Sequence, residues 1–274
     1  MSRCLRPIDS HYGAVKCGQC MPCRVSKRRE WTGKLLLEAN EYEISTFLTL
    51  TYSDENVPLT HDYLTTLDKE TAVDVIKRFN HRYFIVGEYG DDTKRAHYHA
   101  ILFGMDPNHA YYEAQKHWEK GFIQADLCNT ARLKYVAKYT TKKLTKEDDH
   151  RLEPGQEPEF ARFSQRPQLG HKTLERTIAY FKTAQGRQII EKYGDIPKTY
   201  RTGGTDYAWS QYSHRKIRTA LGIPAKTSEI RLTHPEYVHP PELMPDAEEM
   251  RTRWNHHHAQ TKRQEIYKSA AKAL

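Results

Sequence analysis

The chain has 274 residues, with 43 Lys and Arg against 35 Asp and Glu and a formal net charge of +8. This length allows a substantial hydrophobic core, and the excess of positive charge favours a polyanionic partner, above all nucleic acid. The longest apolar stretches fall short of the roughly 18 apolar residues of a membrane span, and no apolar run follows the N-terminus, so we expect a protein of the cytoplasm without structural disulfides.

Four of the five cysteines lie near the N-terminus, at Cys4, Cys17, Cys20 and Cys23. Three cysteines separated by two residues each can ligate one ion through their thiolates, and Cys4 would complete a tetrahedral structural zinc site. Iron-sulfur clusters use similar spacings, and reduced cysteines without a ligand are the simplest alternative, but the many neighbouring basic residues favour zinc. Cys128 stands apart and is expected to be a small buried thiol.

The middle of the sequence predicts a compact unit of helices and strands that ends near residue 144. The expected elements are a basic amphipathic helix over 24–42, a strand over 45–52, a helix from an Asp68 N-cap to about residue 82, an antiparallel hairpin of strands over 83–88 and 96–103, a helix over 108–120, a strand over 122–127, and a helix from an Asn129 N-cap to about residue 144.

Beyond residue 144 the pattern is weaker. Prolines among charged residues predict extended connectors over 145–170 and 223–245, whereas 173–193, 209–221 and 247–274 are expected to be helical. We therefore divide the chain into three expected regions: 1–44 with the Cys cluster and the basic helix, 45–144 as the core, and 145–274 as a linker with a C-terminal helical extension.

The predicted hairpin places three metal-ligating side chains together. His97 and His99 are two positions apart in a strand, so both imidazoles point to one face and Tyr98 points to the other. Glu88, in the preceding strand, would return beside them. Two neutral nitrogens and one carboxylate can bind a divalent cation and leave positions open for water and a phosphate oxygen, which suits phosphoryl chemistry. The alternative is an ordinary half-exposed strand with two histidines.

The last helix of the expected core repeats Tyr-x-x-Lys. Tyr135, Lys138, Tyr139 and Lys142 fall within one arc of roughly 100°, and Leu133, Val136, Ala137 and Leu144 form the opposite, packing side. We expect the tyrosines to face outward from that packing side. A phenol with a pKa near 10 becomes a nucleophile only beside a cation, a base or a phosphate polarised by a metal. A basic surface helix with ordinary tyrosines is the alternative.

These motifs occur in the order found in the HUH endonucleases. The first is Phe47-Leu-Thr-Leu-Thr-Tyr52, the second is His97-Tyr-His99 with Glu88 before it, and the third is Tyr135-Val-Ala-Lys-Tyr139. The chain most closely resembles the replication initiators of the microviruses, small single-stranded DNA phages, in their short gokushovirus form. The cysteine spacing over 17–23 and the stretch 160–167 add to this resemblance, and the motifs themselves span about 45–144.

The resemblance implies an α+β fold with an HUH/Rep-type central antiparallel sheet flanked by helices, preceded by the Cys cluster and followed by a mainly helical extension. It implies a site-specific endonuclease and strand transferase that starts rolling-circle replication, leaving a 5′-phosphotyrosyl protein and a free 3′-hydroxyl before rejoining the ends. By position, Mg or Mn would bind Glu88, His97 and His99, the nucleophiles would be Tyr135 and Tyr139, and Lys138 and Lys142 would assist them.

The expected partners are single-stranded or supercoiled phage DNA at the origin and a host polymerase, in the host cytoplasm and without a membrane. A host helicase is expected as well, because the sequence has no Walker-type phosphate-binding motif. Two rival interpretations stay open. One is a transposase or relaxase of the same fold, and the other is a zinc-containing DNA-binding regulator without catalytic activity.

Overall fold

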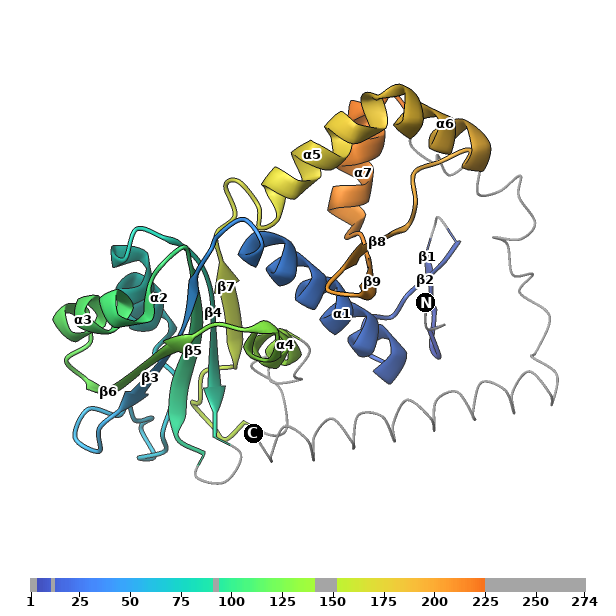
Figure 1. Ribbon diagram of the computed structural model, residues 1–274. Coiled ribbons are helices and arrows are strands. Elements are labelled where there is room, and N and C mark those ends of the chain that lie inside the picture. Colours follow the sequence, from blue (N-terminus) through green and yellow to red (C-terminus); the bar gives the residue numbers. More distant parts are fainter. Residues whose placement is uncertain (1–3, 11–12, 91–93, 141–151, 225–274) are drawn as a thin grey trace. The chain divides into compact units, whose positions relative to one another are not determined.

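The computed structural model describes residues 4–10, 13–90, 94–140 and 152–224 (Figure 1). The chain forms two compact units. One comprises residues 31–179 and 199–208 and contains the central sheet, and the other comprises 1–30, 180–198 and 209–274. Within the described ranges, no helix combines the length and the apolar character needed to cross a membrane.

A five-stranded antiparallel sheet forms the centre of the larger unit. Its strands are β3 (Ser45–Tyr52), β4 (Arg82–Tyr89), β5 (Ala96–Phe103), β6 (Gly121–Leu127) and β7 (Phe160–Phe163). They are arranged in the order β6-β3-β5-β4-β7, with every neighbouring pair antiparallel. The predicted α+β class, with helices flanking an antiparallel sheet, is confirmed (Figure 1).

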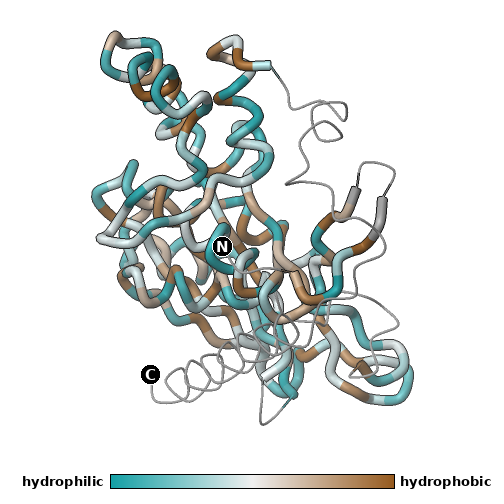
Figure 2. Tube along the Cα trace, turned by 90° about the vertical axis from the view of Figure 1, so that its right-hand side faces the viewer, coloured by the Kyte–Doolittle hydropathy of each residue, from teal (hydrophilic) through white to brown (hydrophobic). Residues whose placement is uncertain are grey.

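The alternation of side chains along the strands gives the sheet two hydrophobic faces, and hydrophobic and hydrophilic positions interchange along the chain trace (Figure 2). On one face the buried core includes Leu48, Leu50, Tyr98 and Leu102, together with residues of α2 (Lys69–Arg78) and α3 (Pro107–His117). On the other face it includes Phe47, Phe84, Ile101 and Phe103, together with residues of α4 (Thr130–Tyr139) and of the second half of α1 (Met21–Ala39). The helices thus bury both sheet faces.

Two predicted N-caps are confirmed. Asp68 Oδ1 accepts a hydrogen bond from Thr71 N at 3.0 Å at the start of α2, and Asn129 Oδ1 accepts one from Arg132 N at 3.0 Å at the start of α4. The helix boundaries differ by a few residues from the prediction. The helix α2 ends at Arg78 because the chain enters β4 at Arg82, and α1 begins in the cysteine cluster, at Met21.

The expected connector over 145–170 contains the fifth strand. Residues Phe160–Phe163 form β7, an edge strand that pairs with β4 in the register Phe84↔Phe163 and Gly87↔Phe160. A Cβ atom on Gly87 would lie 2.4 Å from the Phe160 ring, so only glycine allows this close packing. The strand is only four residues long and lies between two prolines, so its local pattern predicts a connector. The compact unit with the sheet therefore includes residues on both sides of the expected 45–144 core.

The described part of the C-terminal extension is mainly helical, as expected. It contains α5 (His171–Lys182), α6 (Ala184–Tyr193) and α7 (Gln211–Ala220), with a small hairpin of β8 (Thr199–Thr202) and β9 (Thr205–Ala208). A second small hairpin, β1 (Ile8–Ser10) with β2 (Gly13–Val15), precedes α1. The helix predicted over 173–193 is divided because the Thr183 side chain caps α6 at Gly186 N, 3.2 Å away. The helix expected over 247–274 lies outside the described residues.

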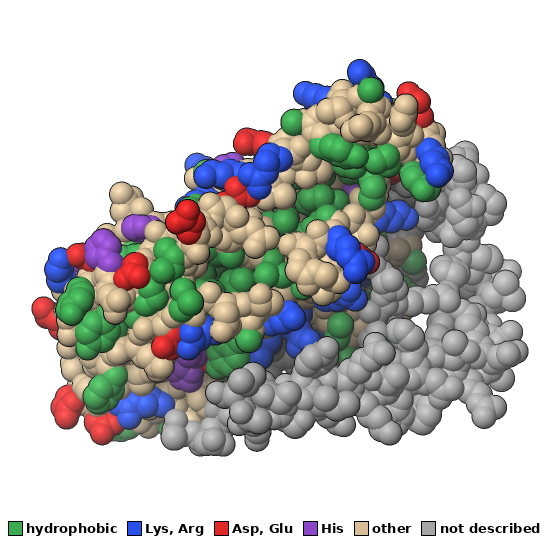
Figure 3. Space-filling view, in the orientation of Figure 1, with side chains coloured by type: hydrophobic (Ala, Val, Ile, Leu, Met, Phe, Trp, Pro, Cys, Tyr) green, Lys and Arg blue, Asp and Glu red, His purple; other side chains and the backbone are tan. Residues whose placement is uncertain are grey.

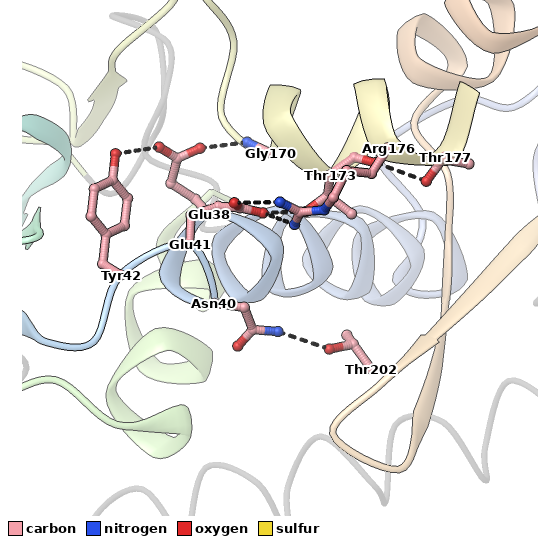
Figure 4. A network of polar contacts seen from close by, with 9 residues as sticks. All are labelled: Glu38, Asn40, Glu41, Tyr42, Gly170, Thr173, Arg176, Thr177 and Thr202. Atoms are coloured by element: carbon pink, nitrogen blue, oxygen red, sulfur yellow. Dashed lines mark hydrogen bonds and ion pairs between the residues drawn. The ribbon is translucent and has the colours of Figure 1, made fainter. Parts of the chain in front are cut away.

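A buried carboxylate joins α1 to the sheet. Glu38 is only 2% exposed and accepts hydrogen bonds from the Arg82 guanidinium, from Gly170 N at 2.6 Å and from Tyr42 Oη at 3.4 Å. Nearby, the Arg176 guanidinium pairs with Glu41 and holds the pKa of that carboxyl below its usual range (Figure 4). Glu38 thereby connects a helix, strand β4 and the segment that leads into α5.

We predict that Glu38→Ala destabilises the larger unit by about 3–5 kcal/mol, because it leaves the partly buried Arg82 charge and the Gly170 amide without their acceptor. The matched control is Arg176→Ala, which breaks an ion pair whose cationic side chain is 64% exposed and should cost about 0–1 kcal/mol. Urea unfolding followed by circular dichroism measures both. Equal losses in the two variants would contradict the structural role of Glu38.

Candidate active site

The structure brings the three predicted ligands of the divalent cation together. Glu88 on β4 is the direct cross-strand partner of His97 on β5, and His99 follows two positions later on the same sheet face. Glu88 Oε1 lies 3.0 Å from Nε2 of His97 and 3.0 Å from Nε2 of His99. One ligand atom from each residue lies within 4.8 Å of the other two. A single cation can therefore contact all three.

Hydrogen bonds on the far side of each imidazole set its orientation. His97 Nδ1 lies 3.0 Å from the Arg95 carbonyl oxygen, which only accepts, so Nδ1 carries the proton and Nε2 offers a lone pair. His99 Nδ1 lies 3.0 Å from Thr49 Oγ1. His99 Nε2 is buried and makes no hydrogen bond to any described residue, although Glu88 is near. A buried nitrogen in this state beside a carboxylate fits a metal ion.

Burial also favours the protonation state that metal binding needs. Desolvation lowers the pKa of His99, and this effect outweighs the opposing influence of the Glu88 carboxylate. His99 is therefore a neutral imidazole at neutral pH, which is the form that ligates a cation. Phe47 contributes to this desolvation because its ring stacks on the imidazole, with the ring centroids 5.2 Å apart.

Tyr98, between the two histidines, packs on the opposite sheet face. It is fully buried, and its hydroxyl donates to Asp68 O at 3.0 Å and accepts from Asp68 N at 2.7 Å. Burial strongly raises the pKa of Tyr98. An aromatic residue at this position therefore connects β5 to the N-terminus of α2, without disturbing the alternation that directs both histidines to the other face.

The two tyrosines of α4 point toward the histidines, and the prediction that they face outward is wrong. The Tyr135 hydroxyl donates to Glu88 Oε1 at 3.2 Å, and its ring centroid lies 5.3 Å from that of His99. Tyr139 is only 7% exposed, and its ring centroid lies 6.4 Å from that of His99 and 5.1 Å from that of Tyr135. Both rings pack at the margin of the helix–sheet interface, because contact with the imidazole buries apolar surface that would otherwise face water.

Lys138 lies over both phenol rings. Its Nζ is 4.3 Å from the ring centroid of Tyr135 and 4.9 Å from that of Tyr139, within the range of a cation–π interaction. Tyr139 differs from Tyr135 in its burial, which together with the negative charge of Glu88 strongly raises its pKa. Lys142, the other expected assisting residue, lies outside the described residues.

Phe47 and Thr49 are contributors to the site that the sequence did not single out. Both belong to β3, and the register Thr49↔His99 sets Thr49 beside the second histidine. The alternating pattern of 45–52 held the information that Phe47, Thr49 and Thr51 share one face. Which face that is depends on the pairing of β3 with β5, which a pattern within one strand does not contain.

The four N-terminal cysteines also converge, within the smaller unit. Cys4 Sγ lies 3.5 Å from Cys17 Sγ and 3.8 Å from Cys20 Sγ, and all four sulfur atoms, with that of Cys23, lie within 4.8 Å of one another. A tetrahedral zinc site with Zn–S bonds of about 2.3 Å separates its sulfur atoms by about 3.8 Å. The geometry fits a Cys4 metal site.

The backbone around the cysteines favours a thiolate at one position. The amides of Cys20 and Gln19 donate to Cys17 Sγ and lower the pKa of that thiol to about 6. Burial instead raises the pKa of Cys23 to about 12, so this thiol would lose its proton on binding a metal. Cys128, expected to be buried, is half-buried against the sheet core and lies in the other unit.

Comparison with known proteins adds independent information. Residues 45–144 match the family model of the replication-associated protein ORF2. The replication-associated protein VP4 of Bdellovibrio phage phiMH2K is 28% identical, over 72% of this chain and 76% of its own length. The replication-associated protein ORF4 of Chlamydia phage 1 is 26% identical over 47% of this chain and 38% of its own length, and ORF2 of Spiroplasma virus 4 is 28% identical over 49% and 50%. No solved structure matches the chain.

The matched stretch contains the sheet strands β3 to β6, the three residues around the candidate cation site and both tyrosines of α4. The expected relationship is confirmed: residues 45–144 carry a replication-associated domain of the ORF2 family, and the chain is a relative of the replication-associated proteins of small phages.

Proposed function

We propose that the protein is a site-specific single-stranded DNA endonuclease and strand transferase that initiates rolling-circle replication through a tyrosine nucleophile. The observation that carries this proposal is the position of the Tyr135 hydroxyl, 3.2 Å from a carboxylate oxygen that itself lies 3.0 Å from both histidine nitrogens. A nucleophile beside a cation site is what attack on a phosphodiester requires.

The chain's own residues define the reaction. A divalent cation such as Mg or Mn, held by Glu88, His97 and His99, would polarise the scissile phosphate. The tyrosine oxygen forms a bond to phosphorus, the bond from phosphorus to O3′ breaks, and the leaving oxygen takes a proton to become a free 3′-hydroxyl. The phosphotyrosyl bond keeps the energy of the phosphodiester, so a 3′-hydroxyl can attack it in reverse and rejoin the ends without ATP.

The two tyrosines have unequal access to DNA. Tyr135 is half-buried with its hydroxyl at Glu88, whereas Tyr139 is buried and has a raised pKa. We therefore assign the first cut to Tyr135 and the second, after rearrangement of the rings, to Tyr139. Lys138, close to both rings, would hold the phosphate or the phenolate charge.

The proposed partners follow from this reaction. They are single-stranded or supercoiled phage DNA at its origin, and a host helicase and a host polymerase that extends the 3′-hydroxyl, in the host cytoplasm. A transposase or relaxase would share the cut but act on transposon ends or plasmid transfer origins. A DNA-binding regulator with zinc at the cysteines would form no covalent product, so covalent capture separates it from the proposal.

We predict that Tyr135→Phe with Tyr139→Phe abolishes covalent capture of DNA while single-stranded DNA binding persists, because both nucleophilic oxygens are lost. The substrate is single-stranded DNA with a randomised central segment, incubated with Mn, and adducts are detected by their resistance to SDS. Of the single variants, Tyr135→Phe should lose more adduct than Tyr139→Phe. Tyr111→Phe on α3, whose side chain is 38% exposed, is the matched control and should keep full activity. An adduct in the double variant would refute the nucleophile assignment, and mass spectrometry would locate the residue that carries it.

We predict that His97→Ala lowers adduct formation by at least about 100-fold, because a metal site with one imidazole fewer loses both affinity and orientation. His109→Ala, on α3 and 62% exposed, is the matched control and should be unaffected. Adduct yield is measured over a series of Mn and Mg concentrations. Undiminished yield in His97→Ala at every concentration would remove this residue from the site.

We predict that the purified protein contains about one zinc per chain, measured by elemental analysis, because four thiolates at tetrahedral separation select zinc. Cys20→Ser should lose the metal and lower the thermal stability of the smaller unit, whereas Cys128→Ser should retain it. Iron in place of zinc, with the visible absorption of an iron-sulfur cluster, would contradict the assignment and favour the alternative ligation.

A further inference from the structure

An exposed aromatic residue lies in the same row of the sheet as the candidate cation site. Phe122 on β6 pairs with Thr51, Thr51 pairs with His97, and His97 pairs with Glu88. Directly paired residues direct their side chains to the same face, so these four form one row across four strands. At a strand spacing of about 4.8 Å, the Phe122 and His97 backbones are about 10 Å apart.

The burial of this row changes abruptly along its length. Glu88 is 2% exposed and Phe122 is 68% exposed. Phe122 belongs to neither hydrophobic core of the described residues, although Ile123, the next residue, packs on the core of the opposite face. A single exposed apolar side chain is common on protein surfaces. One at the end of the row that contains the proposed metal ligands is placed to contact the substrate.

The backbone holds Phe122 firmly in this position. Gly121 approaches β3 so closely that a Cβ atom there would lie 2.3 Å from Thr51 O, and Ser53 N donates to Lys120 O at 2.9 Å just before the strand begins. The ring is therefore attached to a fixed strand and not to a loop. A pre-positioned ring loses little conformational freedom when a ligand covers it.

We infer that Phe122 is a stacking platform for a base of single-stranded DNA close to the scissile phosphate. This inference rests on the proposed function, because it needs the DNA backbone at the triad. Every base offers an aromatic face, and stacking on a side chain contributes a large share of single-strand binding. A base seated on Phe122 would fix the strand on one side of the cut, while the triad holds the phosphate. Hydrophobic and charged side chains are interspersed on the visible surface of the molecule (Figure 3), as such binding requires.

The test uses the full chain with Tyr135→Phe and Tyr139→Phe, and fluorescein-labelled single-stranded DNA with a randomised central segment as the probe. Phe122→Leu and Phe122→Ala should weaken binding by about 5-fold to about 150-fold, and Phe122→Tyr, which keeps the ring, should stay within about 3-fold of the parent. The salt dependence should be unchanged, because stacking neutralises no phosphate. Tyr112→Ala is the matched control, a 64% exposed aromatic on α3, which packs on the opposite sheet face, and it should bind normally.

A second measurement uses the chain with both tyrosines intact. The sequence captured in the adduct identifies the cut, and 2-aminopurine placed at successive positions beside it should be quenched at one position in a manner that Phe122→Leu removes. Wild-type adduct together with unchanged binding and quenching in Phe122→Leu would overturn this inference alone. Absence of any wild-type adduct would overturn the proposed function and this inference with it. Phe122→Leu preserves an apolar side chain at an exposed position, so its folding, checked by circular dichroism, is not at risk.

Discussion

The pairing register of strands β3, β4 and β5 is the constraint on which the candidate site depends. The pairs Thr51↔His97, Thr49↔His99 and Glu88↔His97 set three strands so that the two imidazoles and the carboxylate share one face. A shift of one strand by one residue would turn its entire set of side chains to the opposite face. The register is secured by burial on both sides of the sheet, because a slipped β5 would expose Tyr98 and Ile101 or bury His97 among leucines.

The sequence predicts this part of the fold well because the determining patterns are local. The antiparallel hairpin of β4 and β5 has two strands of alternating or continuous apolar residues around a short polar turn, and it alone brings Glu88 to the histidines. The caps at Asp68 and Asn129 are equally local, since each side chain bonds an amide three residues away. The cysteine cluster is read from spacing within 20 residues.

The remaining features depend on contacts distant in sequence. Strand β7 exists because β4 offers it an edge and Gly87 leaves room for Phe160, and neither fact is visible within residues 160–163. The predicted orientation of the tyrosines is wrong for the same reason. Helical periodicity separates Leu133, Val136 and Ala137 from Tyr135 and Tyr139, but it does not show that the imidazole of His99 and the ring of Phe47 extend the packing surface to the tyrosines.

The unequal burial of the two tyrosines restricts how they can alternate. They are four residues apart on one helix, their rings are in contact, and Lys138 lies over both, so one cation cannot serve two phosphates at once. Tyr139 reaches a phosphate only if its ring leaves the contact with His99, and a phosphotyrosyl bond at Tyr135 provides the reason to do so, because the bulky anion occupies the space beside Glu88 and Tyr135 no longer donates to that carboxylate. The covalent state of the first tyrosine would in this way prepare the second, with α4 as the element that holds both at a fixed separation.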